Sequence, residues 1–255
     1  MIRATTIYFL YVGAAGLLLP GVPPRNRFRA AAAAALGLAL TALTASASTF
    51  WLRDAVLPLV LLLWAYWASG LLWVAPMLAA ERFLARADGV LRMRQIAARI
   101  PLPLYACLEL AYLGVYPLIP IGFGLHMVHA DVPDPERFWT VVLVTDFVCF
   151  GMLPWIQTRP PRALEPPMRR APSLRAFNLG LLRQTSIGVN TVPSGHAAEA
   201  VAVALLLSGA PPAVTIAVWF GALAISAGAV LGRYHFALDV LAGWAVALVV
   251  WIAFS

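Results

Sequence analysis

Apolar residues gather into long stretches along the chain, separated by segments rich in arginine, proline and glycine. Eight of these stretches approach the ~20 residues that a helix needs to cross a bilayer. We therefore predict an all-α, polytopic transmembrane helix bundle with about eight spans. They are expected at residues 4–20, 29–51, 55–80, 102–126, 138–157, 195–209, 213–232 and 235–254.

Two of the connecting segments are unusual. Residues 81–101 alternate arginine with apolar residues at near-helical spacing, which is typical of an amphipathic helix in the membrane interface. Residues 158–192 form the only long polar connection, and a loop of this length usually carries function or is disordered. The chain has no internal repeat, so we treat residues 1–255 as a single integral membrane domain.

Composition then narrows the class of protein. Charged residues make up 11% of the 255, against about 25% in soluble domains, and 62% of the residues are hydrophobic. These values exclude a soluble globular enzyme, a disordered chain and a disulfide scaffold. The net charge of +7 comes from arginines placed between the spans, so we expect contacts to anionic lipid of the bilayer rather than to nucleic acid.

Several charged residues occur at positions that predict structural roles. Arg169, Arg170, Arg175 and Arg183 are expected to face lipid or to set topology, as most loop arginines of membrane proteins do. Glu109 lies in the fourth span among three tyrosines, at a spacing that is more typical of packing than of chemistry.

Polar residues that the apolar pattern does not need occur at three places within residues 155–240, each at a span end on the same membrane face. Three segments remote in sequence can therefore meet at one depth. The segments are Arg159-Pro160-Pro161-Arg162, Pro193-Ser194-Gly195-His196 and Arg233-Tyr234-His235-Phe236-Ala237-Leu238-Asp239.

The first two segments offer donors to a phosphate. Ser194 and Gly195 begin a predicted helix, where free backbone N–H groups and the helix dipole favour an anion. The sixth span, which they open, measures only about 21 Å, so its first residues should lie in a recessed pocket. Arg159 and Arg162 carry planar guanidinium forks that suit phosphate oxygens.

The two histidines suggest a division of labour. His235 and Asp239 are four residues apart and share one face of a helix, so the carboxylate can fix the imidazole tautomer and leave the other nitrogen free to attack phosphorus. His196 would then protonate the leaving group. We expect no metal ion and no cofactor.

Pro193-Ser194-Gly195-His196 followed by His235 and Asp239 resembles the type 2 phosphatidic acid phosphatase superfamily over roughly residues 138–255. The resemblance implies a six-helix membrane core and phosphoryl transfer through a phosphohistidine without a metal. It makes His196 the general acid, His235 the nucleophile and Asp239 the group that orients it. Ser194, Gly195 and the arginines would bind phosphate.

The chain departs from that family's pattern in two places. The family's first element begins with a lysine seven residues before its arginine, whereas this chain contains no lysine and has other residues seven positions before Arg159 and Arg162. The Pro160-Pro161-Arg162 form is more similar to the inositolphosphotransferase and sphingolipid-synthase branch. A Ser-Arg pair before the third element is replaced by Gly-Ala, and Arg233 is the candidate to supply the missing positive charge.

The sidedness of the site rests on two conflicting signals. Fifteen arginines fall on the membrane face that holds the motifs and three on the other, which predicts a cytoplasmic site. Bacterial members of the superfamily, in contrast, often act on the outer face of the inner membrane. We expect a bacterial inner-membrane protein and leave the face open.

Three functions remain in competition. The first is a lipid-phosphate phosphatase acting on a phosphorylated lipid such as phosphatidic acid, phosphatidylglycerol phosphate or a polyprenyl diphosphate. The second is a phosphotransferase that passes a phosphate or phospho-headgroup to a lipid or inositol-like acceptor. The third is a non-enzymatic lipid-binding or transport protein. The enzyme is preferred because His196, His235 and Asp239 are all present.

Overall fold

The structure is a computed structural model that describes residues 1–130, 132–165 and 173–255, so Arg169 and Arg170 lie outside the described residues. This part of the chain is helical and contains no β-strand; one isolated bridge joins Thr158 and Asn190. The elements are α1 (Ile2–Leu18), α2 (Pro24–Ser46), a π-helix (Trp51–Val56), α3 (Leu57–Gly70), α4 (Leu78–Val90), α5 (Met93–Arg99), α6 (Leu102–Leu113), α7 (Val115–His129), α8 (Pro135–Gly151), α9 (Pro161–Leu164), α10 (Ser173–Thr185), α11 (Gly195–Leu206), α12 (Pro212–Leu231) and α13 (Ala237–Ala253).

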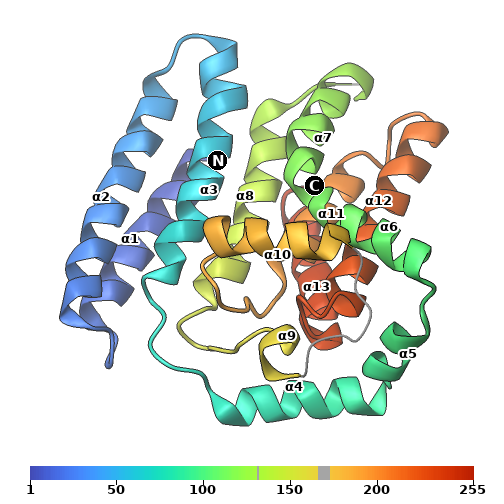
Figure 1. Ribbon diagram of the computed structural model, residues 1–255. Coiled ribbons are helices and arrows are strands. Elements are labelled where there is room, and N and C mark those ends of the chain that lie inside the picture. Colours follow the sequence, from blue (N-terminus) through green and yellow to red (C-terminus); the bar gives the residue numbers. More distant parts are fainter. Residues whose placement is uncertain (131, 166–172) are drawn as a thin grey trace.

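Small residues bring the first two helices into close contact at one side of the bundle (Figure 1). A Cβ added to Gly16 would lie 2.4 Å from the Cβ of Ala30, and one added to Gly37 would lie 2.3 Å from the ring of Phe9. Such close backbone approach is how helices pack where lipid removes the hydrophobic drive for association. The α1–α2 pair is thereby attached to α3 and α8.

Helix α11 is the centre of the other part of the bundle and packs against α7, α8, α12 and α13. Its run of alanine and valine is almost entirely buried, which lets four neighbours approach it closely. A Cβ on Gly243 of α13 would lie 2.5 Å from the carbonyl oxygen of Ser194. The start of α11, where Ser194 and His196 lie, is therefore held tightly against α13.

Several helices are compatible with an integral membrane protein. Within the described residues, three are long and apolar enough to cross a bilayer: α2, α12, and the π-helix with α3 as the unit Trp51–Gly70. Helices α5 and α6 together pass the same test but bend by 118°. Shorter apolar helices are α1, α7, α11 and α13. The arrangement in eight spans with a six-helix core stays a prediction.

Two expected elements are interrupted. Gly114 divides the stretch 102–126 into α6 and α7, so this expected span is not one continuous helix. The amphipathic segment 81–101 divides into α4 and α5 at Arg92, whose φ of 54° lies in the left-handed region. The described residues of the connection 158–192 contain two helices, α9 and α10.

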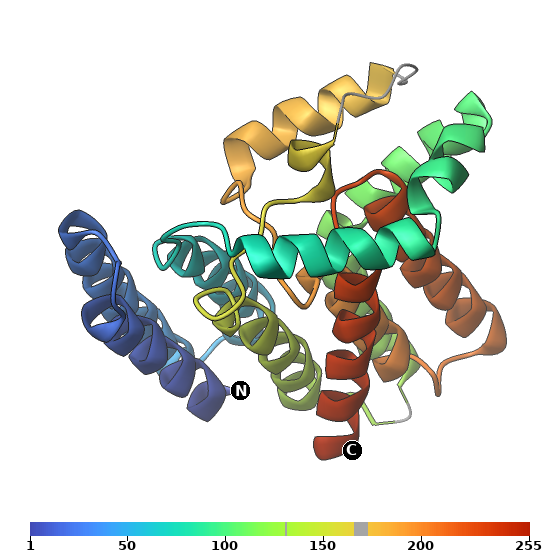
Figure 2. The ribbon, with the colours of Figure 1, turned by 90° about the horizontal axis from the view of Figure 1, so that it is seen from below.

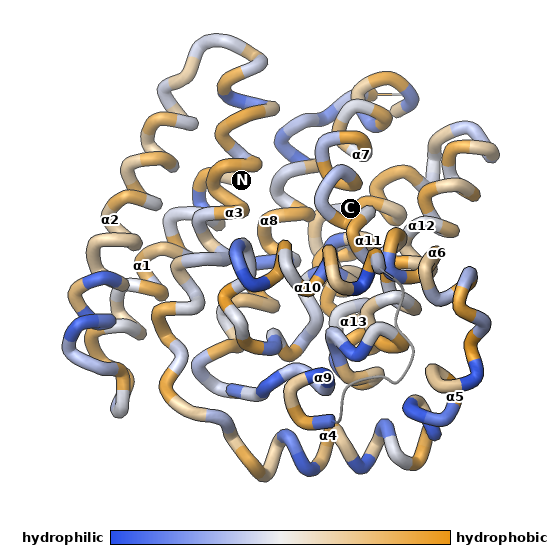
Figure 3. The backbone as a smooth tube through the Cα atoms, viewed as in Figure 1, coloured by the Kyte–Doolittle hydropathy of each residue, from blue (hydrophilic) through white to orange (hydrophobic). Residues whose placement is uncertain are grey.

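The polar helices lie at the surface of the apolar bundle. Helix α4 runs along its base and crosses beneath the other helices (Figures 1 and 2), while α10 crosses one side. Hydrophilic residues gather on α4, α5, α9 and α10, and the upright helices are largely apolar (Figure 3). The three predicted motif segments lie at this polar end of the molecule.

Candidate active site

Ser194 and Gly195 form the N-terminus of α11, as expected, but their backbone N–H groups already have hydrogen-bond acceptors. The Ser194 side chain accepts from Ala197 N at 3.4 Å, and Ser194 N donates to the carbonyl of Asp239 at 2.9 Å. Gly195 N donates to Thr191 Oγ1 at 3.4 Å. The expectation of free N–H groups at both residues is therefore wrong. Their visible role is to join the α11 and α13 segments.

The segment with His235 begins where α12 ends. Arg233 has a φ of 59°, and the backbone N–H groups of Tyr234 and His235 both donate to the carbonyl of Ala229. This turn closes α12 and delivers His235 two residues ahead of α13. The position of the imidazole is thus set by the turn and by the start of α13.

Asp239 is fully buried and accepts two hydrogen bonds at Oδ2, from Phe236 N at 2.9 Å and from Asn190 Nδ2 at 2.8 Å. His235 Nδ1 lies 3.8 Å from the same oxygen. The two side chains adjoin as the spacing predicted, yet the distance exceeds that of a hydrogen bond. Catalytic hydrogen bonds are often long until substrate is present. Sequence reasoning missed Asn190, which holds the carboxylate from the long connection.

A cavity brings the two histidines together. It is lined by Tyr66, Tyr112, Phe150, Arg162, Leu182, Ser186, Val189, Thr191, His196, Tyr234 and His235. The imidazole centroids of His196 and His235 are 6.0 Å apart. The Tyr112 ring stacks on His196 at 5.2 Å and on Tyr234 at 3.9 Å, and Tyr116 meets His196 edge to face. This aromatic packing fixes the His196 ring against the cavity wall.

The three candidate arginines have different environments. Arg162 lines the cavity, with its guanidinium 5.2 Å from the Tyr234 ring and Nη1 3.4 Å from the Tyr234 carbonyl. Arg159 is paired with Glu81 through Nη2 at 2.8 Å and Nε at 2.9 Å. Arg233 is paired with Glu165 at 2.9 Å. Among the described arginines only Arg162 faces the two histidines.

The family model of the PAP2 superfamily matches residues 139–255. The match covers a little less than half of the chain, and over these residues the sequence is similar to that superfamily. The match confirms the resemblance drawn from the motifs. Members of the superfamily are generally phosphatases or phosphotransferases, which indicates phosphoryl-transfer chemistry. Neither the curated proteins nor the solved structures gave a significant match to the chain.

A buried polar network adjoins the cavity through Tyr234, and the sequence pattern assigned its residues to other roles. Arg175 is buried and donates from Nη1 to Glu109 at 2.6 Å, to Tyr105 Oη at 2.8 Å and to the Gly232 carbonyl at 2.9 Å. The expectation that Arg175 faces lipid or sets topology is therefore wrong. An ionisable residue inside a predicted span is itself a signal of function, and Glu109 carried that signal.

Glu109 also receives the residue that precedes His235. Tyr234 Oη donates to Glu109 Oε2 at 2.5 Å, and Asn178 Nδ2 donates to the same oxygen at 2.6 Å. Burial raises the pKa of Tyr234, so its hydroxyl stays protonated and remains a donor at neutral pH. The network fastens α10 and the His235 turn to α6.

Proposed function

We propose that this protein is a metal-independent lipid-phosphate phosphatase that acts through a phosphohistidine on His235. The observation that carries the proposal is that His196, His235 and Arg162, from three separate segments, line one cavity. A nucleophile, a proton donor and a fixed cation around one space are what phosphoryl transfer requires. The apolar helices around the cavity favour a phosphorylated lipid.

The proposed chemistry has two steps. In the first, one imidazole nitrogen of His235 attacks phosphorus while His196 donates its proton to the lipid oxygen, so an N–P bond forms and the P–O bond breaks. In the second, His196 accepts a proton from water, and the resulting hydroxide breaks the N–P bond and releases inorganic phosphate. Arg162 would hold the phosphoryl oxygens throughout, and Asp239 would stabilise the charged His235 ring.

A direct test measures phosphate release in detergent with EDTA, using phosphatidic acid, phosphatidylglycerol phosphate and a polyprenyl diphosphate. Wild type should release phosphate, and His235→Ala should lower the rate by ~10³-fold or more. His129→Ala is the matched control, because His129 ends α7 and does not line the cavity. Release that requires a divalent ion, or that survives in His235→Ala, would contradict the proposal.

A phosphotransferase is the second candidate. Beyond the groups that a phosphate needs, the cavity presents the hydroxyls of Ser186 and Thr191, and Tyr66 donates to Ser186 at 3.0 Å. Hydroxyl groups of this kind suit a polar acceptor. Transfer to inositol or diacylglycerol, with no phosphate release in their absence, would favour this function over hydrolysis.

A further inference from the structure

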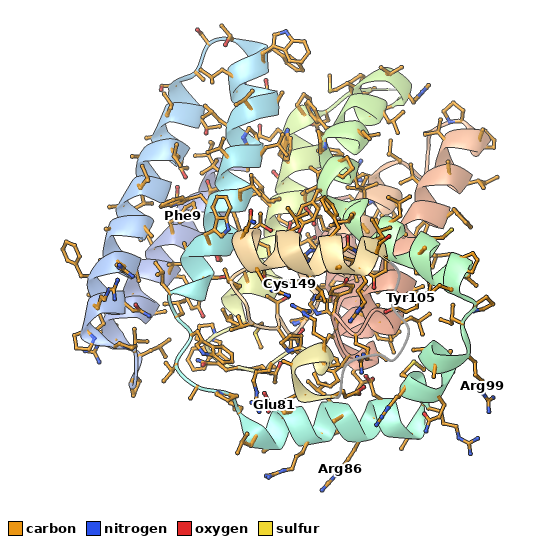
Figure 4. All side chains as sticks on the ribbon, in the orientation of Figure 1. Phe9, Glu81, Arg86, Arg99, Tyr105 and Cys149 are labelled. Atoms are coloured by element: carbon orange, nitrogen blue, oxygen red, sulfur yellow. The ribbon has the colours of Figure 1, made fainter. Side chains whose placement is uncertain are left out.

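Helix α4 lies before the family-matched residues, yet its inner face contacts all three catalytic segments. Glu81, Leu84 and Asp88 are spaced three and four residues apart and therefore share one side of the helix. Glu81 and Leu84 are buried, while Arg82, Phe83 and Arg86 on the other side are exposed. Figure 4 shows Arg86 projecting away from the molecule and Glu81 lying toward the bundle.

The first contact joins α4 to the segment after α8. Glu81 accepts from the backbone N–H of Arg159 at 2.8 Å and pairs with its guanidinium. The hydrogen bonds and charge of Arg159 lower the pKa of Glu81, so the carboxylate stays ionised near neutral pH. Met77 N also donates to the Gln157 carbonyl at 2.6 Å. Arg162, which lines the cavity, follows this fastened segment.

The second contact is apolar. Leu84 packs in one buried cluster with Val192 and Phe236. Val192 lies four residues before His196, and Phe236 directly follows His235. Leu84 thus belongs to the same buried cluster as residues next to both histidines.

The third contact reaches the start of α13. Asp88 Oδ1 accepts the backbone N–H of Ala237 at 3.0 Å. Ala237 is the first residue of α13 and lies two residues after His235. An N–H group in the first turn of a helix has no partner inside the helix, so Asp88 supplies the missing acceptor.

Resting on the proposed function, we propose that α4 is a brace that positions His235 relative to His196 and Arg162, with Asp88 as its main positioning residue. Asp88 acts through the Ala237 N–H and does not touch the substrate. The Tyr234 side chain, which precedes His235, is bound by Glu109, and the Ala237 backbone N–H, which follows it, is bound by Asp88. Losing one of these holds lets the imidazole shift, and a shift of about 1 Å can cost about 10² in rate.

The test compares four variants of the full-length protein on the lipid phosphate that wild type hydrolyses fastest. Asp88→Ala removes the acceptor and should lower kcat tenfold or more, with KM little changed. Asp88→Asn keeps an acceptor oxygen without the charge and should retain kcat within about twofold. Asp88→Glu keeps the charge but extends the side chain by one methylene, so its kcat should fall between these two.

Asp134→Ala is the matched control. Asp134 also accepts a backbone N–H at a helix start, from Arg137 at 2.9 Å, but it is the N-cap of α8, which carries none of the three motif segments. It should lose thermal stability without losing kcat. If Asp88→Ala does not fold, Asp88→Glu and Asp88→Asn decide the question alone.

Each outcome is decisive. If kcat is unchanged in Asp88→Ala and Asp88→Glu, the proposal that α4 positions His235 is wrong. Equal losses of kcat in Asp88→Asn and Asp88→Ala would also contradict it, because they would assign the effect to the charge of Asp88. A loss confined to KM would place Asp88 in substrate binding and would also overturn it. An inactive wild type would instead contradict the proposed function, so the two failures are distinguishable.

Discussion

The regions before and after residue 139 contribute different kinds of groups to the site. The region that matches the family model, residues 139–255 and called the PAP2 region from here on, supplies most of the side chains that line the cavity, including His196, His235 and Arg162. The earlier region supplies Glu81, Asp88 and Glu109, carboxylates that bind arginines or backbone N–H groups of the PAP2 region. The proposed reacting groups therefore lie inside the family match, while several of the carboxylates that bind their segments come from helices outside it.

The largest expected effect comes from removal of Glu109, which tests whether the region before residue 139 holds the PAP2 region in place. Glu109→Ala would leave the Arg175 guanidinium buried without its carboxylate, and breaking such a pair costs about 3–5 kcal/mol of unfolding free energy. Thermal unfolding in detergent measures the loss. The double variant Glu109→Leu with Arg175→Leu removes both charges and should recover most of the stability. An unaltered melting temperature in Glu109→Ala would show that the Glu109–Arg175 pair does not stabilise the fold.

The arginines test the division of roles within the PAP2 region. Arg162→Ala should lower kcat/KM by about 10²- to 10³-fold, because a fixed donor to the phosphoryl oxygens is lost. Arg159→Ala should lower it less, since Glu81 still accepts the backbone N–H of residue 159. Steady-state kinetics on one lipid phosphate compares them. A larger loss in Arg159→Ala would reverse the assignment of the phosphate arginine.

Gly243 tests whether the motif segments also depend on packing inside the PAP2 region. Gly243→Ala would place a methyl group 2.5 Å from the Ser194 carbonyl and force α11 and α13 apart. We expect a loss of about 1–3 kcal/mol in unfolding free energy, with a fall in kcat. Gly221→Ala in α12 is the control, because open space surrounds that position. Equal stability of the two variants would contradict close packing at the site.

The smallest expected effect is a pH dependence that comes from α4. Burial, with Asp239 and Glu165 nearby, raises the pKa of Asp88 to about 6, above the value of an unfolded chain. The folded state then binds more protons between about pH 4 and 6, so this group makes stability fall as pH rises through that window. Asp88→Asn should flatten this part of the stability profile, measured as melting temperature against pH. A profile unchanged from wild type would exclude Asp88 as the source.

The sequence pattern named three residues that the structure brings to one cavity, but it assigned some of their neighbours wrongly. Arg162, His196 and His235 do line one cavity, and the family model confirms the resemblance over residues 139–255. Arg159 is paired with Glu81 instead, and Arg175 is buried where a lipid-facing or topological residue was expected. A motif predicts which residue types occur together. The direction of a long arginine side chain, in contrast, depends on which carboxylate the fold places near it, Glu81 for Arg159 and Glu109 for Arg175.

By itself the sequence determined the helical, apolar character of the chain and the three segments that hold its reactive groups. Both follow from local properties: hydrophobic runs of bilayer length and the fixed spacing of motif residues. Only the tertiary structure decided which arginine faces the histidines, and that α4 and α6 hold the His235 turn. Those contacts join Asp88 to Ala237 and Glu109 to Tyr234, 149 and 125 residues apart, and no local pattern records a pairing over such separations.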